Sequence, residues 1–163
     1  MLRRCLSIAG FLALVSSVGL AQERGAAAPP KAPEIAAFAD ARKPVALSDV
    51  ERAFIHREMR EFLASLQEIL EASATGDHAR AAASASRVGM NGPEKDHIPK
   101  SLAPKLPLEF KQLGLATHRG FDRIADEAKR RGSADLAPKQ IGELMQNCVA
   151  CHGTWRIVGE AGK

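Results

Sequence analysis

The sequence lacks the features that mark several large functional classes. It has no dense block of Lys and Arg with interleaved aromatic residues, so it gives no support for nucleic-acid binding. No nucleophile is paired with a base, and no two carboxylates are arranged as an acid–base pair, so the sequence does not predict an enzyme. A carrier or binding function fits these absences better.

Strand signals are absent as well. The 163 residues suffice for one domain with a single core. Their apolar residues recur every three or four positions, which is the spacing of a helix that buries one face. The expected fold class is therefore all-α.

The N-terminus has the layout of a secretory signal peptide. Residues 1–4, MLRR, are basic, residues 5–20, CLSIAGFLALVSSVGL, carry no charge, and small residues precede Gln22. This pattern predicts export to the periplasm with cleavage after Ala21. An uncleaved membrane anchor is the alternative, but the apolar run is short for crossing a bilayer. No stable membrane insertion is expected after cleavage.

Cleavage would change both the charge and the cysteine content of the chain. Loss of Arg3 and Arg4 reduces the 23 basic residues to 21 against 19 acidic ones, so the net charge falls from +4 to +2. Loss of Cys5 leaves Cys148 and Cys151 as the cysteines of the mature chain, in an oxidising compartment. Both remaining thiols belong to one motif.

The predicted signal peptide covers residues 1–21. The composition of the remaining chain divides it into three parts. Residues 22–47 are rich in Ala and Pro, which predicts a flexible lead segment. Residues 48–157 carry the helical patterns and form the predicted folded domain, and residues 158–163 are a short tail.

Local capping signals fix the expected helices. Ser48 stands three residues before Glu51, a capping box that starts a helix, and Gly76 is available as its left-handed stop. Asp77 can cap the next helix, which is almost entirely Ala, Ser and Arg. The expected helices cover about residues 48–74, 78–88 and 107–131, and a fourth runs from about residue 138 into the cysteine motif.

Three of these helices carry an apolar stripe at helical spacing. Two short connections and one long one join the four helices, which predicts an antiparallel four-helix bundle. The stripe residues are Ile55, Met59, Phe62, Leu63, Leu66, Ile69 and Leu70 in the first helix, Phe110, Leu113, Thr117, Phe121, Ile124, Ala125 and Ala128 in the third, and Ile141, Leu144 and Met145 in the fourth.

The segment NCVACHGTW, residues 147–155, contains the CxxCH pattern of c-type haem attachment. Its two thiols, Cys148 and Cys151, can add across two vinyl groups on one porphyrin edge, and the imidazole of His152 then lies beneath the iron. At about 100° per residue, these three side chains and Trp155 share about a third of a helix circumference. The pattern predicts one covalent haem c attached on the C-terminal helix.

The two thiols also allow three interpretations other than haem attachment. A zinc site needs a second Cys/His pair at ligand spacing, which the sequence lacks. A thioredoxin-like pair lies at a helix N-terminus after a strand, whereas this pair follows a helical pattern. A local disulfide between Cys148 and Cys151 would close a haem-free helical interaction module.

The residues CVACHGTWR, near the end of the last helix, resemble the cytochrome c′ family of exported four-helix cytochromes, including its six-coordinate low-spin relatives. The resemblance covers residues 48–157 through helix order and motif position, with Trp155 where the family usually has Tyr or Phe. It implies a set of haem contacts, namely thioether bonds from Cys148 and Cys151, proximal iron ligation by His152, packing of Trp155 beside the ring and a propionate contact from Arg156.

The group at the sixth coordination position of the iron decides the function. In the family, the residue that faces this position comes from the first helix. Met59 is the candidate ligand, because it lies near the middle of the first stripe and a thioether is a known haem ligand. The alternative is a Met that fills a gap in the core. His56, one turn earlier, would give bis-His ligation. Met145 is expected in the core, and His118 is expected at the boundary of the third stripe.

The sequence thus predicts a periplasmic c-type cytochrome that transfers single electrons through a haem with His152 and Met59 as axial ligands. The alternative is a five-coordinate high-spin haem protein that binds nitric oxide or carbon monoxide, with Met59 only packed against the haem. The expected partners are redox proteins, and a homodimer paired through helices is a further option that the resemblance implies.

Overall fold

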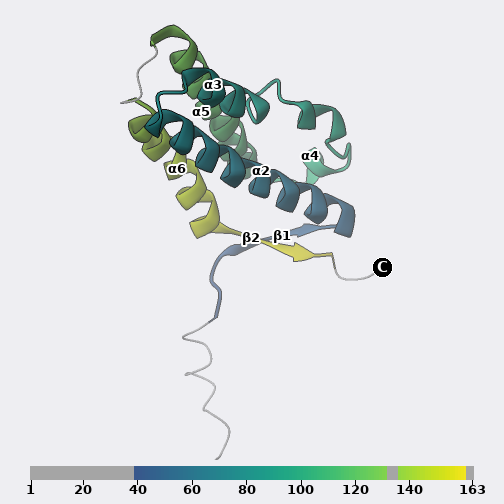
Figure 1. The fold of residues 1–163 in the computed structure, drawn as a ribbon. Helices are drawn as coiled ribbons and strands as arrows, with labels where there is room; N and C mark the ends of the chain where they lie inside the picture. Colours follow the sequence, from purple (N-terminus) through teal and green to yellow (C-terminus); the bar gives the residue numbers. More distant parts are fainter. Residues whose placement is uncertain (1–38, 132–135, 161–163) are drawn as a thin grey trace, which may run out of the picture. The chain divides into compact units, whose positions relative to one another are not determined.

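The computed structural model describes residues 39–131 and 136–160, so the predicted signal peptide and most of the predicted lead segment lie outside the described residues. Within that range no helix is long and apolar enough to cross a membrane. The elements in chain order (Figure 1) are β1 (Lys43–Leu47), α2 (Asp49–Ala74), α3 (His78–Arg87), the 3₁₀ helix η1 (Pro93–His97), α4 (Leu102–Lys105), α5 (Leu108–Arg131), α6 (Leu136–Thr154) and β2 (Trp155–Gly159).

The predicted capping signals of the first two helices are confirmed. Ser48 Oγ accepts a hydrogen bond from the Glu51 amide, and the Ser48 amide donates in return to Glu51 Oε2 at 2.8 Å, so α2 begins at a complete capping box. Gly76 has a φ of 73° directly after α2, a conformation that favours glycine. The Asp77 side chain then accepts from the Arg80 amide at 3.0 Å and starts α3.

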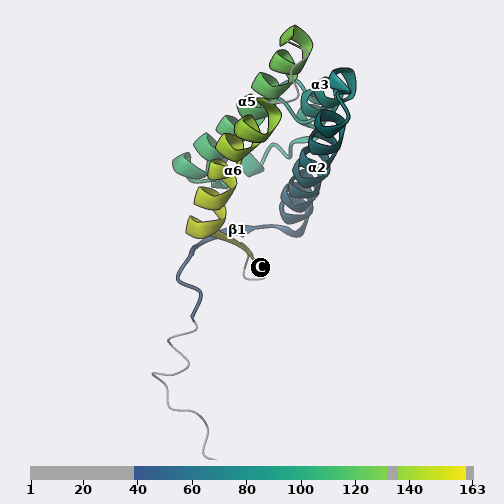
Figure 2. The same cartoon turned by 60° about the vertical axis from the view of Figure 1, so that its left-hand side comes forward.

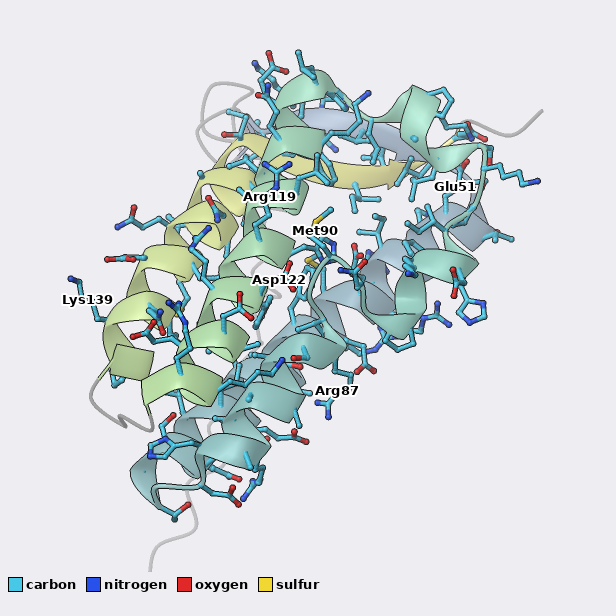
Figure 3. All side chains as sticks on the ribbon, turned by 90° about the horizontal axis from the view of Figure 1, so that it is seen from above. Glu51, Arg87, Met90, Arg119, Asp122 and Lys139 are labelled. Atoms are coloured by element: carbon cyan, nitrogen blue, oxygen red, sulfur yellow. The ribbon has the colours of Figure 1, made fainter. Side chains whose placement is uncertain are left out.

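Helix α3 packs against both α2 and α5, and α5 also packs along α6 (Figure 2). The buried face of α3 is made of small residues, which lets its neighbours come close. The turn after α3 is fixed to α5, because the Met90 amide donates to Asp122 Oδ2 at 3.2 Å (Figure 3). Helix α2 contacts α6 less extensively than α3. The described chain is therefore mostly helical, as predicted.

Two clusters of buried side chains form the core. The larger joins the four long helices, with Phe62, Ile69, Ala85, Val88, Phe121, Ile124, Ala125, Ile141 and Leu144. The smaller lies between β1, the first half of α2 and α4, with Val45, Leu47, Phe54, Ile55 and Leu102. Met59 packs against both clusters, which places it between them.

Three residues predicted to lie on buried stripes are exposed instead. Leu63 is 69% exposed, Leu70 is 45% exposed and Met145 is 45% exposed. Each follows a residue that is buried, and the next position on a helix points about 100° further round the axis. The neighbouring helices cover only the sector that holds Phe62 and Ile69, so an apolar residue one position later faces outward.

The absence of strands was a wrong expectation. β1 and β2 pair in parallel, with Lys43 opposite Trp155 and Leu47 opposite Gly159. β1 belongs to the segment predicted to be a flexible lead, and β2 runs into the predicted tail. Trp155, expected on the last helix, is the first residue of β2. The pairing of two distant five-residue segments is a long-range interaction, and no local pattern encodes it.

Candidate cofactor site

A cavity of about 290 Å³ is lined by residues from α2, α5, α6, β2 and the segment before β1. Such a volume is at the lower end of the range for small-molecule and cofactor sites, about 300–1,000 Å³. All six residues predicted to hold the haem and its iron line this cavity: Met59, Cys148, Cys151, His152, Trp155 and Arg156.

The cysteine motif occupies the last turns of α6. Cys148 and Cys151 are half-buried free thiols, so they carry no disulfide in the structure. Burial raises the pKa of both thiols, and the neighbouring Cys148 raises that of Cys151 further. Both thiols are therefore protonated at neutral pH, unlike a redox-active pair, in which one thiol has a lowered pKa. The His152 side chain is exposed beside them.

No group of three or more His, Cys, Asp or Glu side chains in the described residues is arranged to hold a metal ion by itself. The cavity instead offers isolated donors on different walls. His152 lies on α6, and Met59 lies on α2 among the partly buried residues that pack against the core. His56 also lines the cavity, one turn before Met59, but its side chain is exposed.

Three further residues of types that can bind iron, Met90, His118 and Met145, do not line this cavity. Met145 does not line the cavity, and its exposure contradicts the expected core position. Met90 and His118 line a separate cavity of about 130 Å³. The His118 ring lies at the edge of the α5 stripe, as expected, and packs against Phe62 with 5.1 Å between ring centroids.

His118 is held by two hydrogen-bonding contacts. Its Nδ1 lies 2.8 Å from the Val88 carbonyl oxygen, and its Nε2 lies 3.3 Å from Glu58 Oε1. Burial acts to lower the pKa of His118, but the contacts with Glu58 and Val88 outweigh it, so the pKa is raised. Both ring nitrogens are engaged, and His118 is a structural residue beside the cavity wall.

Trp155 lines the cavity and carries an unsatisfied donor. Its indole Nε1 is buried and has no hydrogen-bond partner within the described residues. Its ring packs at 69° to Phe110, with 6.4 Å between centroids, and Lys43 Nζ lies 5.2 Å from the ring centroid. Leaving a buried donor unpaired costs about 1–3 kcal/mol. Neighbouring atoms shield this N–H from the cavity, so Trp155 contributes its ring to the cavity wall.

Arg42 is the site residue that sequence reasoning missed. It lines the cavity, and its Nη1 donates to the carbonyl oxygen of His152 at 3.2 Å. Arg156 Nε donates to the Arg42 carbonyl oxygen at 3.2 Å, so the two arginines lie together at one end of the site. The segment before β1 had been expected to be flexible. Val45 and Leu47 are buried in β1, but two apolar residues on one face are too few to predict a strand from the sequence.

The chemical capacity of the site follows from these donors. Two thiols one helical turn apart can form two covalent bonds to one flat ligand, and an imidazole and a thioether, both of which can bind iron, line the cavity from α6 and α2. The guanidinium groups of Arg42 and Arg156 suit acidic groups on the same ligand. Comparisons with protein-family models, curated proteins and solved structures found no match to this chain.

Proposed function

We propose that this chain is a c-type cytochrome that carries single electrons through one covalently attached haem. The observation that carries the proposal is the common cavity of Cys148, Cys151, His152 and Met59, which come from two separate helices. When bound, the haem supplies the one-electron chemistry, and the protein tunes it through axial ligands and burial. We further propose export to the periplasm on residues 1–21, with redox proteins as partners.

Each cavity residue has a role that its surroundings support. Cys148 and Cys151 hold the porphyrin edge through thioether bonds, and their half-buried positions keep that edge against α6. His152 is the proximal iron ligand. The Trp155 ring would pack beside the porphyrin, and the Arg156 guanidinium suits the propionates, which are anionic acceptors.

Met59 is the proposed sixth ligand. Its side chain is half-buried and lines the cavity from α2, whereas His152 lines it from α6, so the two lie on different walls. Met59 also packs against both core clusters, which limits the positions that its thioether can take. A thioether ligand raises the reduction potential of a c-type haem, which suits an electron carrier.

The proposal includes the antiparallel four-helix bundle formed by α2, α3, α5 and α6, with the haem on α6. The mutual packing of α3 with α2 and α5, and of α5 with α6, supports it. The looser contact of α2 with α6 suits this architecture, since the cavity is lined from both of these helices.

A five-coordinate gas-binding haem protein is the second candidate. The observation that favours it is the apolar wall around Met59, formed by Ile55, Phe62 and Leu113. A distal face of this kind admits nitric oxide or carbon monoxide if Met59 packs without binding the iron.

The absorption spectrum of the protein, produced in a host with haem-attachment machinery, separates the two candidates. We expect a low-spin spectrum whose far-red sulfur-to-iron band disappears in Met59→Ala. Met145→Ala is the matched control, because Met145 lies outside the cavity, and it should leave the band unchanged. A high-spin spectrum that neither substitution alters would contradict ligation by Met59 and favour the gas-binding candidate.

A further inference from the structure

A segment outside the helices closes one end of the cavity. Residues 40–42 lead into β1, and β1 pairs with β2 directly after the cysteine motif. Arg42 in this segment lines the cavity and reaches the carbonyl oxygen of His152, a residue 110 positions later in the chain.

The carbonyl group that Arg42 contacts belongs to the last turn of α6. The helix ends at Thr154, and the last four carbonyl groups of a helix lack partners within it. A cation that donates a hydrogen bond there satisfies one of them and complements the negative end of the helix dipole. Arg42 therefore fixes the turn of backbone that carries the His152 imidazole.

Arg42 is itself paired with Asp40. Its Nε donates to Asp40 Oδ1 at 2.9 Å and its Nη2 to Asp40 Oδ2 at 2.7 Å, which is the two-pronged geometry that suits a guanidinium and a carboxylate. The Arg42 carbonyl oxygen accepts from Arg156 Nε, and the next residue, Lys43, pairs with Trp155 across the sheet. Contacts with Asp40 in the lead segment and with Arg156 in β2 thus position Arg42 beside the end of α6.

The charge of Arg42 also acts on the site. Arg42 lines the cavity and its partner Asp40 does not, so the guanidinium is the nearer of the two charges to a ligand in the cavity. A nearby positive charge favours the reduced, less positive state of an iron centre. Removal of Arg42 would take away this charge and leave the Asp40 carboxylate unpaired, and both changes favour the oxidised state.

We infer that Arg42 is a positioning residue for His152, which holds the ligand-bearing turn of α6 from outside the helices and raises the reduction potential of the haem. This inference rests on the proposed function. It adds to that function a residue from the lead segment, so the haem site extends beyond the helices.

The test compares Arg42→Ala and Arg42→Lys in the haem-loaded protein with Arg80→Ala as control. Arg80 also forms an exposed ion pair, with Glu71 at 2.9 Å, but it lies on α3 away from the cavity. The measurements are the midpoint potential and two urea transitions, one followed by the haem absorbance and one by the helical circular dichroism.

We expect Arg42→Ala to lower the potential and to shift the haem transition to a lower urea concentration than the helical transition. Arg42→Lys should restore part of both effects, because lysine keeps the charge and one donor but loses the two-pronged contact with Asp40. Wild type and Arg80→Ala should show coincident transitions and the same potential.

Two results would overturn the inference in different ways. A coloured wild-type protein whose Arg42→Ala variant keeps the potential and coincident transitions refutes the role of Arg42 alone, even if the variant is less stable overall. A colourless wild-type protein, made with functioning attachment machinery, refutes the proposed function, and the inference falls with it.

Discussion

At the scale of single residues, Glu51 has two roles. The sequence predicts its role in the capping box but not its buried contacts with other elements. Its spacing from Ser48 predicted the capping box, which is confirmed. Its carboxylate is also 1% exposed and accepts from Ser101 Oγ at 2.6 Å and from Lys105 Nζ at 2.7 Å (Figure 3). Lys105 in turn contacts Glu160 at 2.8 Å, so one buried carboxylate connects α2, α4 and the residue after β2.

These contacts predict a pH dependence of stability. The hydrogen bonds from Lys105 and Ser101 lower the pKa of Glu51 from 4.5 to about 2. A carboxyl group with a lowered pKa contributes stability that is fully present above its unfolded-state pKa and is lost as the pH falls through the folded-state value. The contribution of Glu51 should therefore be complete above about pH 4.5 and decline toward about pH 2.

Urea unfolding of wild type and Glu51→Gln at a series of pH values isolates this contribution. The difference in the free energy of unfolding between the two proteins should be constant at neutral pH and shrink across the acidic window. A difference that stays the same from pH 6 to about pH 2 would show that the Glu51 carboxylate is not stabilised by its neighbours.

The residues of the cysteine motif could be named from the sequence because the chemistry of haem attachment fixes their spacing. The motif placed Cys148, Cys151 and His152 together, and all three line one cavity with Met59. Arg42 was missed because its contacts with the site depend on a strand pairing with no local signature. Met145 was misjudged because apolar spacing identifies a helix but does not determine how wide a sector its neighbours cover.

At the scale of elements, the helices could be predicted and the strands could not. The boundaries of α2 and α3 follow from Ser48, Gly76 and Asp77, each of which acts on backbone groups within a few residues. β1 and β2 form only because the folded helices bring residues 43–47 beside residues 155–159. The resulting strand pair lies at the end of α6, where β2 and the residue before β1 line the cavity.

The contact between α5 and α6 depends on one glycine. A Cβ at Gly120 would lie 2.8 Å from Leu144 Cδ1 and 3.1 Å from Leu144 Cγ, and Leu144 is buried in the larger core cluster. Gly142, on α6, is the matched control because a Cβ there meets no atom within 4 Å. Both substitutions gain the same helix propensity. The difference between the free energies of unfolding of the two variants therefore measures the packing cost at Gly120.

We expect Gly120→Ala to be less stable than Gly142→Ala by about 1–3 kcal/mol, the usual cost of overpacking a core. Gly142→Ala itself should stabilise the protein by about 1 kcal/mol relative to wild type. Thermal and urea unfolding of the three proteins provide the comparison. Equal stability of the two variants would mean that α5 and α6 can separate at this point at no cost.

At the scale of the whole molecule, the described chain is built around one end of α6. The long helices bury the larger core, the smaller core places β1 and α4 against the first half of α2, and the cavity is lined from both sides of this junction. Met59 packs against both clusters, so the proposed sixth ligand lies where the two parts of the core meet.

The most direct test of the central claim is the intact mass of the purified protein under denaturing conditions, after expression in a host that exports it and attaches haem. The account predicts a chain that begins at Gln22 and carries the mass of one haem, and a Cys148→Ala/Cys151→Ala variant with the mass of that chain alone. A wild-type protein with the bare chain mass, made by machinery that loads a known c-type cytochrome in parallel, would contradict covalent haem attachment at these cysteines.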